Sequence, residues 1–377
     1  MPTYLSPGVY VEEVPAATRP IAGVGTAIAG FVGFAPEGPV NAPTLVTSWT
    51  QFASTFGEFT EEFALAKAVY GFFNNGGGRA YIVRLPYSGN GNEPSPALPV
   101  AQLTTAGDKG VAAYTVRALD ANSGSISVVV TPTTVANAPA GAVDIEIQLD
   151  GNHAETYSNL TTAPGKSNVA TAINTASKLV FVDALDADAA ALANGISDGT
   201  VALATDASLP VPTVDTAAVI GDSATRTGFG AFEMFEDITM IAAPDLMIAH
   251  RQGLISDDDA KAVQTAMISH AELMGNRMAI LDTPSGLNAQ AAADWRQNKA
   301  GYDSKFAVTY WPWISIFDPA VGHNIDFPPS GHMAGIWSRN DDTRGVFKAP
   351  ANEVIQGAVG VELNVTRGEM DLLNPMG

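Results

Sequence analysis

Hydrophobic and polar positions in the second half of the chain follow two spacings in turn. Asp237–Asp245 and Arg277–Pro284 each hold a short apolar run closed by an aspartate and a proline. Such runs are typical of strands buried on both faces of a parallel sheet. Between them, apolar residues recur at helical spacing after Ser256, which precedes three aspartates, and stop at Gly275. We predict a strand, a helix and a second strand.

The same alternation continues on both sides of this unit. Ala289–Ala300 reads as a helix and Lys305–Ile314 as a third strand. Near the start of the chain, Ala27–Phe34 predicts a strand, a helix begins at Thr60, and Ala80–Leu85 predicts another strand. Repeated strand–helix–strand units build a mostly parallel sheet with helices on its faces. The predicted fold class is therefore α/β.

A change of composition interrupts this pattern after about residue 86. The segment from about residue 88 to about residue 225 is rich in Ala, Thr, Val, Asp and Gly and holds only three aromatic residues. Short alternating runs predict strands, and Ser167–Lys178 predicts a helix. We expect residues 94–225 to form an inserted β-rich domain and residues 21–93 plus 226–377 to form one discontinuous α/β core. The runs are Ala113–Leu119, Ser125–Thr131 and Val143–Leu149.

Residues 1–20 do not read as part of a compact core. Four prolines punctuate them, yet Val9–Val14 is a clear strand candidate without a local partner. This strand lies either on the sheet edge of its own domain or on another subunit by strand addition. The two glutamates within it discourage unspecific edge pairing. The candidate residues of an inter-subunit arm are Val9, Tyr10, Val11, Glu12, Glu13 and Val14.

Composition excludes several classes of function. Nineteen basic against thirty-nine acidic residues give a net charge of −20, which repels phosphate backbones, so we expect no nucleic-acid partner. The absence of cysteine excludes disulfides and thiolate metal sites. The N-terminus lacks the pattern of a signal peptide, and no apolar run is long enough to span a bilayer. We expect a protein made in the cytoplasm that does not contact a membrane.

Two aspartates are the main candidates for chemistry. Asp245 and Asp282 each follow a predicted parallel strand, and open α/β sheets bind ligands at that edge. Two carboxylates there could hold magnesium. Aspartates beside prolines also cap strands and begin loops. No third acidic ligand, phosphate-binding loop or catalytic lysine accompanies them, so the structural interpretation is favoured.

Other polar motifs also favour structural roles. Asn74–Arg79, NNGGGR, follows a helix instead of preceding one, which predicts a helix end and not a phosphate cradle. The five histidines lack metal-binding spacing, and His270 lies on an apolar helix face. Ser330 is not part of a nucleophile elbow. The sequence thus predicts no cofactor and no enzymatic activity.

Three stretches taken together resemble one known family. They are YLSPGVYVEEV at the N-terminus, AVYGFFNNGGGRAYIVRL at 68–85 and PPSGHMAGIWSRNDDTRGVFKAPAN at 328–352. In this order they resemble the contractile tail sheath proteins of phage tails and phage-tail-like contractile injection systems. The resemblance covers the core on both sides of the inserted segment and does not extend into that segment.

The resemblance implies a structural subunit and not an enzyme. Such subunits stack as hexameric rings in a helical array around an inner tube, and contraction drives the tube through a target envelope. The implied partners are further copies of the chain, the inner tube protein, the baseplate and the terminator or cap proteins. The implied location is a virion tail or a tail-like particle assembled in a bacterial or archaeal cytoplasm. We expect the inserted domain to face outward.

The chain departs from the family pattern at its end. Proteins that resemble it continue past an LNPMG-like segment into a C-terminal domain that receives the arms of neighbours, whereas this sequence stops at Gly377. Either the sequence is incomplete or the subunit assembles by a variant route. Two functions of other classes stay open at this point: a surface adhesin or receptor-binding module, and an α/β enzyme with a metal site at Asp245 and Asp282.

Overall fold

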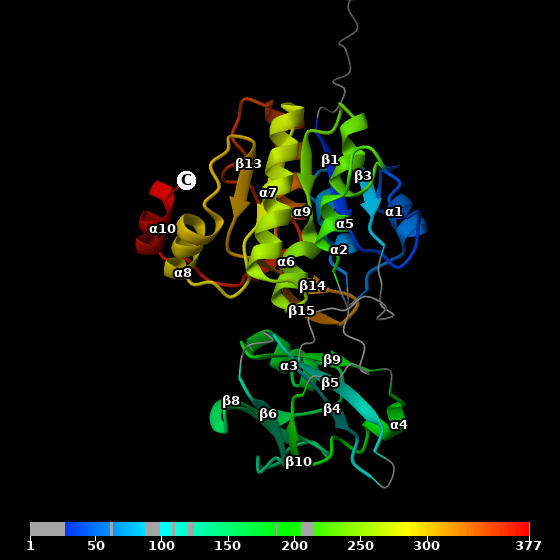
Figure 1. Cartoon of the computed structure of the whole chain (residues 1–377), viewed down its shortest axis with the longest axis vertical. Helices are drawn as coiled ribbons and strands as arrows, with labels where there is room; N and C mark the ends of the chain where they lie inside the picture. Colours follow the sequence, from blue (N-terminus) through cyan, green and yellow to red (C-terminus); the bar gives the residue numbers. More distant parts are fainter. Residues whose placement is uncertain are drawn as a thin grey trace, which may run out of the picture.

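The computed structural model describes residues 27–60, 63–86, 99–107, 110–119, 124–185, 187–204 and 214–376. The predicted arm strand Val9–Val14 lies outside these ranges. The chain is a mixed α/β protein, as predicted, and Figure 1 shows it as two lobes. We call residues 27–86 and 214–376 the large lobe, and residues 99–204 the small lobe.

A six-stranded sheet forms the centre of the large lobe. The neighbouring strands run in the order β13-β12-β11-β1-β3-β2. All pairings are parallel except that of the edge strand β2 with β3. Every residue of β1 and β11 is buried, as the short apolar runs predicted. The strands are β1 (Ile28–Gly33), β2 (Thr44–Val46), β3 (Arg79–Arg84), β11 (Met240–Ala242), β12 (Met278–Asp282) and β13 (Ala307–Tyr310).

The order of the parallel strands defines a switch point. Counted along the chain, β1, β3, β11, β12 and β13 stand in the order 2-1-3-4-5 across the sheet. From β1 the chain adds β3, the next parallel strand, on one side of β1. It later returns to the sheet at β11 and adds β11, β12 and β13 on the other side of β1. Open α/β sheets of this order place their ligand crevice where the direction reverses, at the carboxyl ends of the strands. Here that position lies between β1 and β11.

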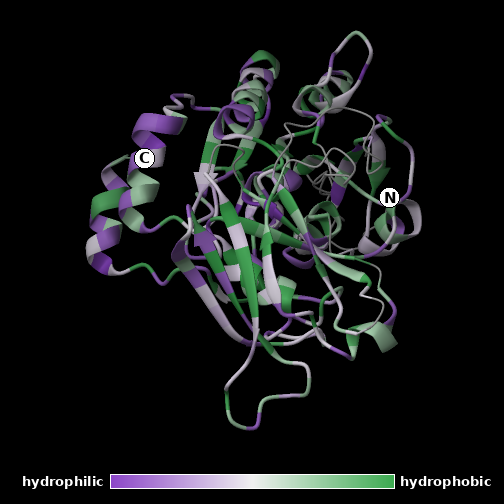
Figure 2. Ribbon diagram, turned by 60° about the horizontal axis from the view of Figure 1, so that its bottom comes forward, coloured by the Kyte–Doolittle hydropathy of each residue, from purple (hydrophilic) through white to green (hydrophobic). Residues whose placement is uncertain are grey.

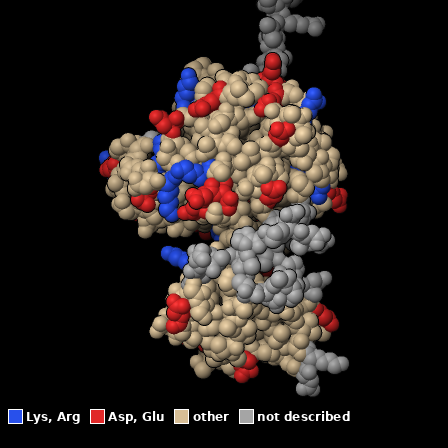
Figure 3. Space-filling view, in the orientation of Figure 1, with Lys and Arg blue, Asp and Glu red and all other residues tan. Residues whose placement is uncertain are grey.

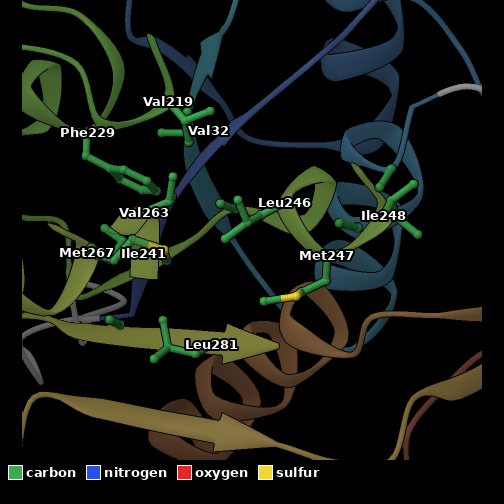
Figure 4. Close-up of a cluster of buried hydrophobic side chains, with 14 of the residues drawn as sticks. Val32, Val219, Phe229, Ile241, Leu246, Met247, Ile248, Val263, Met267 and Leu281 are labelled. Carbon is green, nitrogen blue, oxygen red and sulfur yellow. The ribbon is translucent and has the colours of Figure 1, made fainter. Parts of the chain in front are cut away.

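Helices cover both faces of the sheet. On one face, a hydrophobic core joins β1 and β11 to α5, α6 and α7, and Figure 4 shows Val32, Ile241 and Val263 meeting within it. On the other face, α1, α2 and α9 pack against Phe31 and Ile280. In Figure 2 hydrophobic residues concentrate on the central strands. The helices are α1 (Trp49–Phe56), α2 (Leu65–Asn74), α5 (Thr216–Ile220), α6 (Pro244–Arg251), α7 (Asp257–Met274), α8 (Ala289–Asp294), α9 (Ser330–Arg344) and α10 (Arg367–Leu373).

Local sequence signals set the ends of α7. The Ser256 hydroxyl accepts a hydrogen bond from the backbone N–H of Asp259, whose carboxylate returns to the Ser256 N–H. This is the reciprocal capping that the sequence predicted. Gly275 closes the helix in the left-handed conformation, with φ of 67°.

The third predicted strand is wrong in its extent. Lys305–Ile314 does not form one strand, because β13 ends at Tyr310 and Ile314 begins a different sheet. Pro312 lies between them and has no N–H to continue a ladder. The second sheet is antiparallel, in the order β15-β14-β16. Its strands are β14 (Ile314–Asp318), β15 (His323–Phe327) and β16 (Ala358–Val361).

The small lobe has its own hydrophobic core, between a four-stranded sheet (β10-β6-β7-β8) and a three-stranded sheet (β4-β5-β9). Val100 and Ala204 exchange two backbone hydrogen bonds of 2.8 and 3.0 Å, so the chain enters and leaves this lobe at one place. The chain re-enters the large lobe at α5, whose Val219 is buried in the core that Figure 4 shows. The elements are β4 (Val100–Thr104), β5 (Ala112–Ala118), β6 (Ile126–Pro132), β7 (Val143–Leu149), β8 (Asn152–Leu160), α3 (Val169–Ala176), β9 (Val180–Ala184), α4 (Ala189–Leu192) and β10 (Gly199–Ala202).

Candidate functional site

Asp245 lies at the switch point of the parallel sheet. It follows β11 in the first turn of α6, and only 6% of its surface is exposed. Its Oδ1 accepts a 2.6 Å hydrogen bond from the N–H of Ala64, and its Oδ2 accepts one of 3.1 Å from the N–H of Phe34. Phe34 follows β1, and Ala64 is the N-cap residue of α2. One carboxylate therefore joins three segments that are distant in the sequence.

The local sequence makes room for this carboxylate. A side chain at Gly33 would overlap Asp245 Oδ2, so glycine lets the backbone approach closely. Ala64 cannot cap α2 with its own side chain, and the first N–H groups of a helix need partners. A negative charge is favourable at that end of a helix. Asp245 supplies both the acceptor and the charge.

Burial dominates the electrostatics of Asp245. Desolvation raises the pKa of its carboxyl to about 6, while the backbone N–H donors and Lys67 act in the opposite direction. Lys67 forms a 2.9 Å ion pair with Asp318, and the two side chains are only 5% and 2% exposed. This pair ties α2 to the end of β14.

Asp282 performs a related role on the next strand. It is the last residue of β12, and its Oδ1 accepts a 2.8 Å hydrogen bond from the N–H of Ser330, the first residue of α9. Desolvation raises the pKa of this carboxyl to about 7. Its backbone oxygen accepts a 2.7 Å hydrogen bond from the Gln264 amide of α7. Asp282 thus connects helices on both faces of the sheet.

The two helices held by these aspartates pack closely together. A Cβ at Gly331 or Gly335 of α9 would overlap the backbone of α2, and one at Gly71 of α2 would overlap the ring of His332. Close helix contact at glycines leaves little freedom for sliding. The arrangement fixes α2 and α9 on one face of the sheet.

Metal binding finds no comparable support. Across the ranges that the structure describes, no group of three or more His, Cys, Asp or Glu side chains is placed to hold a metal ion. Asp245 and Asp282 instead accept hydrogen bonds from separate helices. The contacts of both residues match the structural role that the sequence favoured for them.

The remaining candidate motifs make contacts within the large lobe. Asn75 ends α2, as predicted, and its side chain bonds to both backbone groups of Gln356. His270 accepts a 3.1 Å hydrogen bond from Arg277, and burial lowers the pKa of the His270 imidazole to about 4. Burial also lowers the pKa of His332 to about 4. The side chain of Ser330 is fully buried beside the Asp282 carboxyl.

Sequence reasoning missed the buried pair of Lys67 and Asp318. A signal was present, because Lys67 stands four residues after Phe63 and shares its predicted apolar helix face. A lysine on such a face needs a buried partner. The partner could not be named, since Asp318 lies in β14, which the sequence did not predict as a strand.

A cleft of about 950 Å³ separates the two lobes, and Asp245 borders it. Across the junction, Arg117 of the small lobe donates a hydrogen bond to the carbonyl of Gln252 at the end of α6. The same guanidinium pairs with Asp183 at 2.7 Å. Figure 3 shows charged residues spread over the large lobe and few on the visible face of the small lobe. Mixed charges line the cleft, and they define no single class of ligand.

No helix within the described ranges has the length and apolarity to cross a membrane.

Comparison with known proteins gives one family. Residues 236–377 match the sequence model described as the phage tail sheath protein central domain. This segment contains β11, Asp245, Asp282 and α9. None of the curated proteins matches the chain. The resemblance to tail sheath proteins that the sequence suggested is confirmed by this match.

Solved structures of sheath proteins also resemble the chain. The helical sheath of the anti-feeding prophage in its contracted state is 17% identical, with 98% of this chain and 62% of that chain covered and a TM-score of 0.48. A sheath tail protein of Desulfitobacterium hafniense is 13% identical, with 98% of this chain and 70% of that chain covered and a TM-score of 0.38. The contracted PVC sheath complex of an extracellular contractile injection system is 16% identical, with 99% of this chain and 61% of that chain covered and a TM-score of 0.41. The chain thus spans about three fifths of the length of two of these proteins.

Proposed function

We propose, from the premise that residues 236–377 belong to the phage tail sheath family, that the chain is a structural subunit of a contractile tail sheath. The family match is the observation that carries this proposal. In it, copies stack as hexameric rings around an inner tube, between a baseplate and a terminator or cap protein. Contraction of the stack drives the tube through a target envelope.

The internal contacts of the matched segment support a mechanical role. Its buried carboxylates hold helix ends, and glycines bring α2 and α9 into close contact. A subunit that passes force to its neighbours needs elements that do not slide on one another. Buried polar links of this kind are costly to leave unpaired, which favours one fixed arrangement.

The exposed apolar residues support contact with other subunits. Of the fifteen large hydrophobic side chains exposed within the described ranges, eight lie between residues 317 and 372. Phe347 is the most open of them, at 89% exposure, and β16 adds an edge strand beside them. Exposed apolar residues typically mark an interaction site where they are contiguous, and we propose that this segment contacts other subunits. The eight are Phe317, Val346, Phe347, Val354, Val359, Val361, Met370 and Leu372.

Two further proposals concern the N-terminal arm and the inserted domain. We propose that Val9–Val14 pairs with a different copy of the chain, because it has no local partner in the sequence. We also propose that the inserted domain, which the sequence placed at residues 94–225, faces outward and ends before α5, because Val219 of α5 packs in the core of the large lobe. The adjacent ends at Val100 and Ala204 support an insertion, and among the described residues of the small lobe only Val111 and Val135 are exposed large hydrophobics.

Electron microscopy of the purified full chain tests the proposal. We expect stacked rings or long striated tubes in negative stain at an ionic strength that screens the net charge of −20. Replacing Val346 and Phe347 by Asp should abolish these assemblies. The matched control, Asp at Val111 and Val135, should leave them intact, because those exposed residues lie on the small lobe. Small uniform particles of the unaltered chain at every salt concentration contradict the proposal.

A further inference from the structure

The strand order creates a ligand crevice that the proposed sheath function does not use. Sheets of order 2-1-3-4-5 bind ligands at the carboxyl edge, between the first and third strands of that count. Those strands are β1 and β11 here. The loop after β1 and the N-terminus of the ten-residue helix α2 meet at this point. Backbone N–H groups at a helix N-terminus bind small anions.

In this chain the crevice already contains an anionic group. The Asp245 carboxylate receives the two N–H donors, one from Phe34 and one from Ala64. The carboxylate is held as a bound oxyanion would be, with a donor on each oxygen and the N–H of Leu65 acting in the same direction. Gly33 leaves the space that its Oδ2 fills, and the site borders the cleft between the lobes.

The surrounding charges suit one anion at this position. Lys67 stands in the first turn of α2 and acts on Asp245 through its positive charge. Its ammonium group is held by Asp318 at 2.9 Å and by the carbonyl of Thr60 at 2.6 Å. The helix terminus and this lysine together offset part of the cost of burying a negative charge in the crevice.

We propose that Asp245 is a built-in ligand that closes an oxyanion site created by the fold. Removing its carboxylate opens a site for a free carboxylate of matching size. The ligand class is a small monocarboxylate, because the two donors and the space at Gly33 fit one planar carboxylate group. The same residue that suggested a metal site in the sequence therefore excludes external ligands from the crevice.

Chemical rescue tests this assignment in the full chain. Asp245→Ala removes the carboxylate, and formate replaces the missing group. Asp245→Gly also removes the Cβ, and acetate then replaces the whole side chain. We expect each matched ion to raise the Tm of its variant by a few degrees in a saturable way, relative to chloride at equal ionic strength.

Three controls separate binding from general salt effects. The unaltered chain and Asp258→Ala, which removes an exposed carboxylate in the first turn of α7, should show no such rise. Asp245→Asn fills the crevice and should show none either. If a variant is unfolded in chloride, the readout becomes recovery of its far-UV circular dichroism on addition of the matched ion.

The outcomes are decisive in both directions. A matched, saturable gain confined to the Ala and Gly variants supports the built-in ligand. Absence of any gain or recovery in both variants overturns it, as does an equal gain in the unaltered chain or with chloride. Neither result depends on whether the chain assembles into a sheath.

Discussion

The two lobes hold their sheets together in different ways. The large lobe has a parallel sheet whose neighbouring strands are far apart in the chain, and Asp245 bonds to Phe34 across 211 positions. The small lobe is antiparallel, with β6, β7 and β8 joined in sequence. Its buried core contains one aromatic residue, Tyr114, whereas the large lobe buries many phenylalanines and Trp313. We expect the small lobe to fold from its own continuous segment, while the large lobe needs both halves of its sequence.

The two lobes also differ in the charged residues that they bury. The large lobe buries Asp245, Asp282 and the pair of Lys67 and Asp318, each tied to a distant segment. In the described part of the small lobe, Arg117 is the one fully buried charged residue, and it lies at the junction with the large lobe. Charged groups thus occur inside this molecule where separate segments must be held in one arrangement.

Tryptophan fluorescence distinguishes the lobes experimentally. All five tryptophans, at positions 49, 295, 311, 313 and 337, belong to the large lobe. Fluorescence therefore follows unfolding of the large lobe, and far-UV circular dichroism follows both lobes.

The largest effect is expected from breaking the buried ion pair. Lys67→Met leaves Asp318 buried without its partner, which should lower the free energy of unfolding of the large lobe by about 3–5 kcal/mol. The fluorescence transition in urea should move to a much lower midpoint. Lys67→Met combined with Asp318→Leu should recover much of the loss. A single variant within about 0.5 kcal/mol of the unaltered chain would show that this pair does not hold the lobe together.

A core substitution in the small lobe should show the reverse selectivity. Ile147→Ala removes a fully buried side chain from β7 and should cost the small lobe about 2–5 kcal/mol. The circular dichroism signal should gain an earlier transition, while the tryptophan transition stays in place. Equal shifts of both signals would mean that the lobes unfold as one unit.

On acidification, two histidines and two aspartates of the large lobe should change its free energy of unfolding in opposite directions. The folded pKa values of His270 and His332 are about 4 against an ordinary 6.5, so acidification from pH 6.5 to 4 costs stability. Asp245 and Asp282 have folded values of about 6 and about 7 against 3.8, so the same acidification adds stability. Between pH 4 and 6 the four contributions nearly cancel.

Asp282→Asn removes one of the two carboxyl groups that add stability on acidification. Stability of the large lobe, followed by fluorescence, should then fall on acidification by about 1.4 kcal/mol per pH unit more steeply than in the unaltered chain. Asp258→Asn, at an exposed position, serves as the control. Parallel pH profiles for Asp282→Asn and the unaltered chain would contradict the balance.

The smallest effect on folding is expected in the arm. Val11→Pro deletes one backbone donor in the proposed strand Val9–Val14 and should leave both unfolding transitions within about 0.5 kcal/mol. Assemblies seen by microscopy should nevertheless become disordered or disappear. Assemblies of unaltered order would show that the arm does not link subunits.

The sequence predicted those parts of the fold that depend on local pattern. The buried runs gave β11 and β12, and Ser256 with Asp259 gave the start of α7. The break at Pro312 was missed, because an apolar run on both sides of a proline looks continuous when only hydrophobicity is considered. Both aspartates of the site were identified, but not their partners.

Long-range pairing explains what could not be predicted about the site. The donors to Asp245 are backbone N–H groups of Phe34 and Ala64, which carry no side-chain signal. Only the three-dimensional strand order brings these groups to the end of β11. The identity of a carboxylate's partner is therefore a property of topology, and local sequence cannot supply it.

We propose that the large lobe builds the sheath and that the small lobe is carried on it. Replacing residues 99–204 by a short Gly/Ser linker tests this most directly, because Val100 and Ala204 are hydrogen-bonded neighbours and a short linker can join their flanks. We predict an unchanged tryptophan unfolding transition and the same rings or tubes in negative stain as for the full chain. A shortened chain that loses its tryptophan transition, or that folds and fails to assemble where the full chain assembles, would contradict the claim.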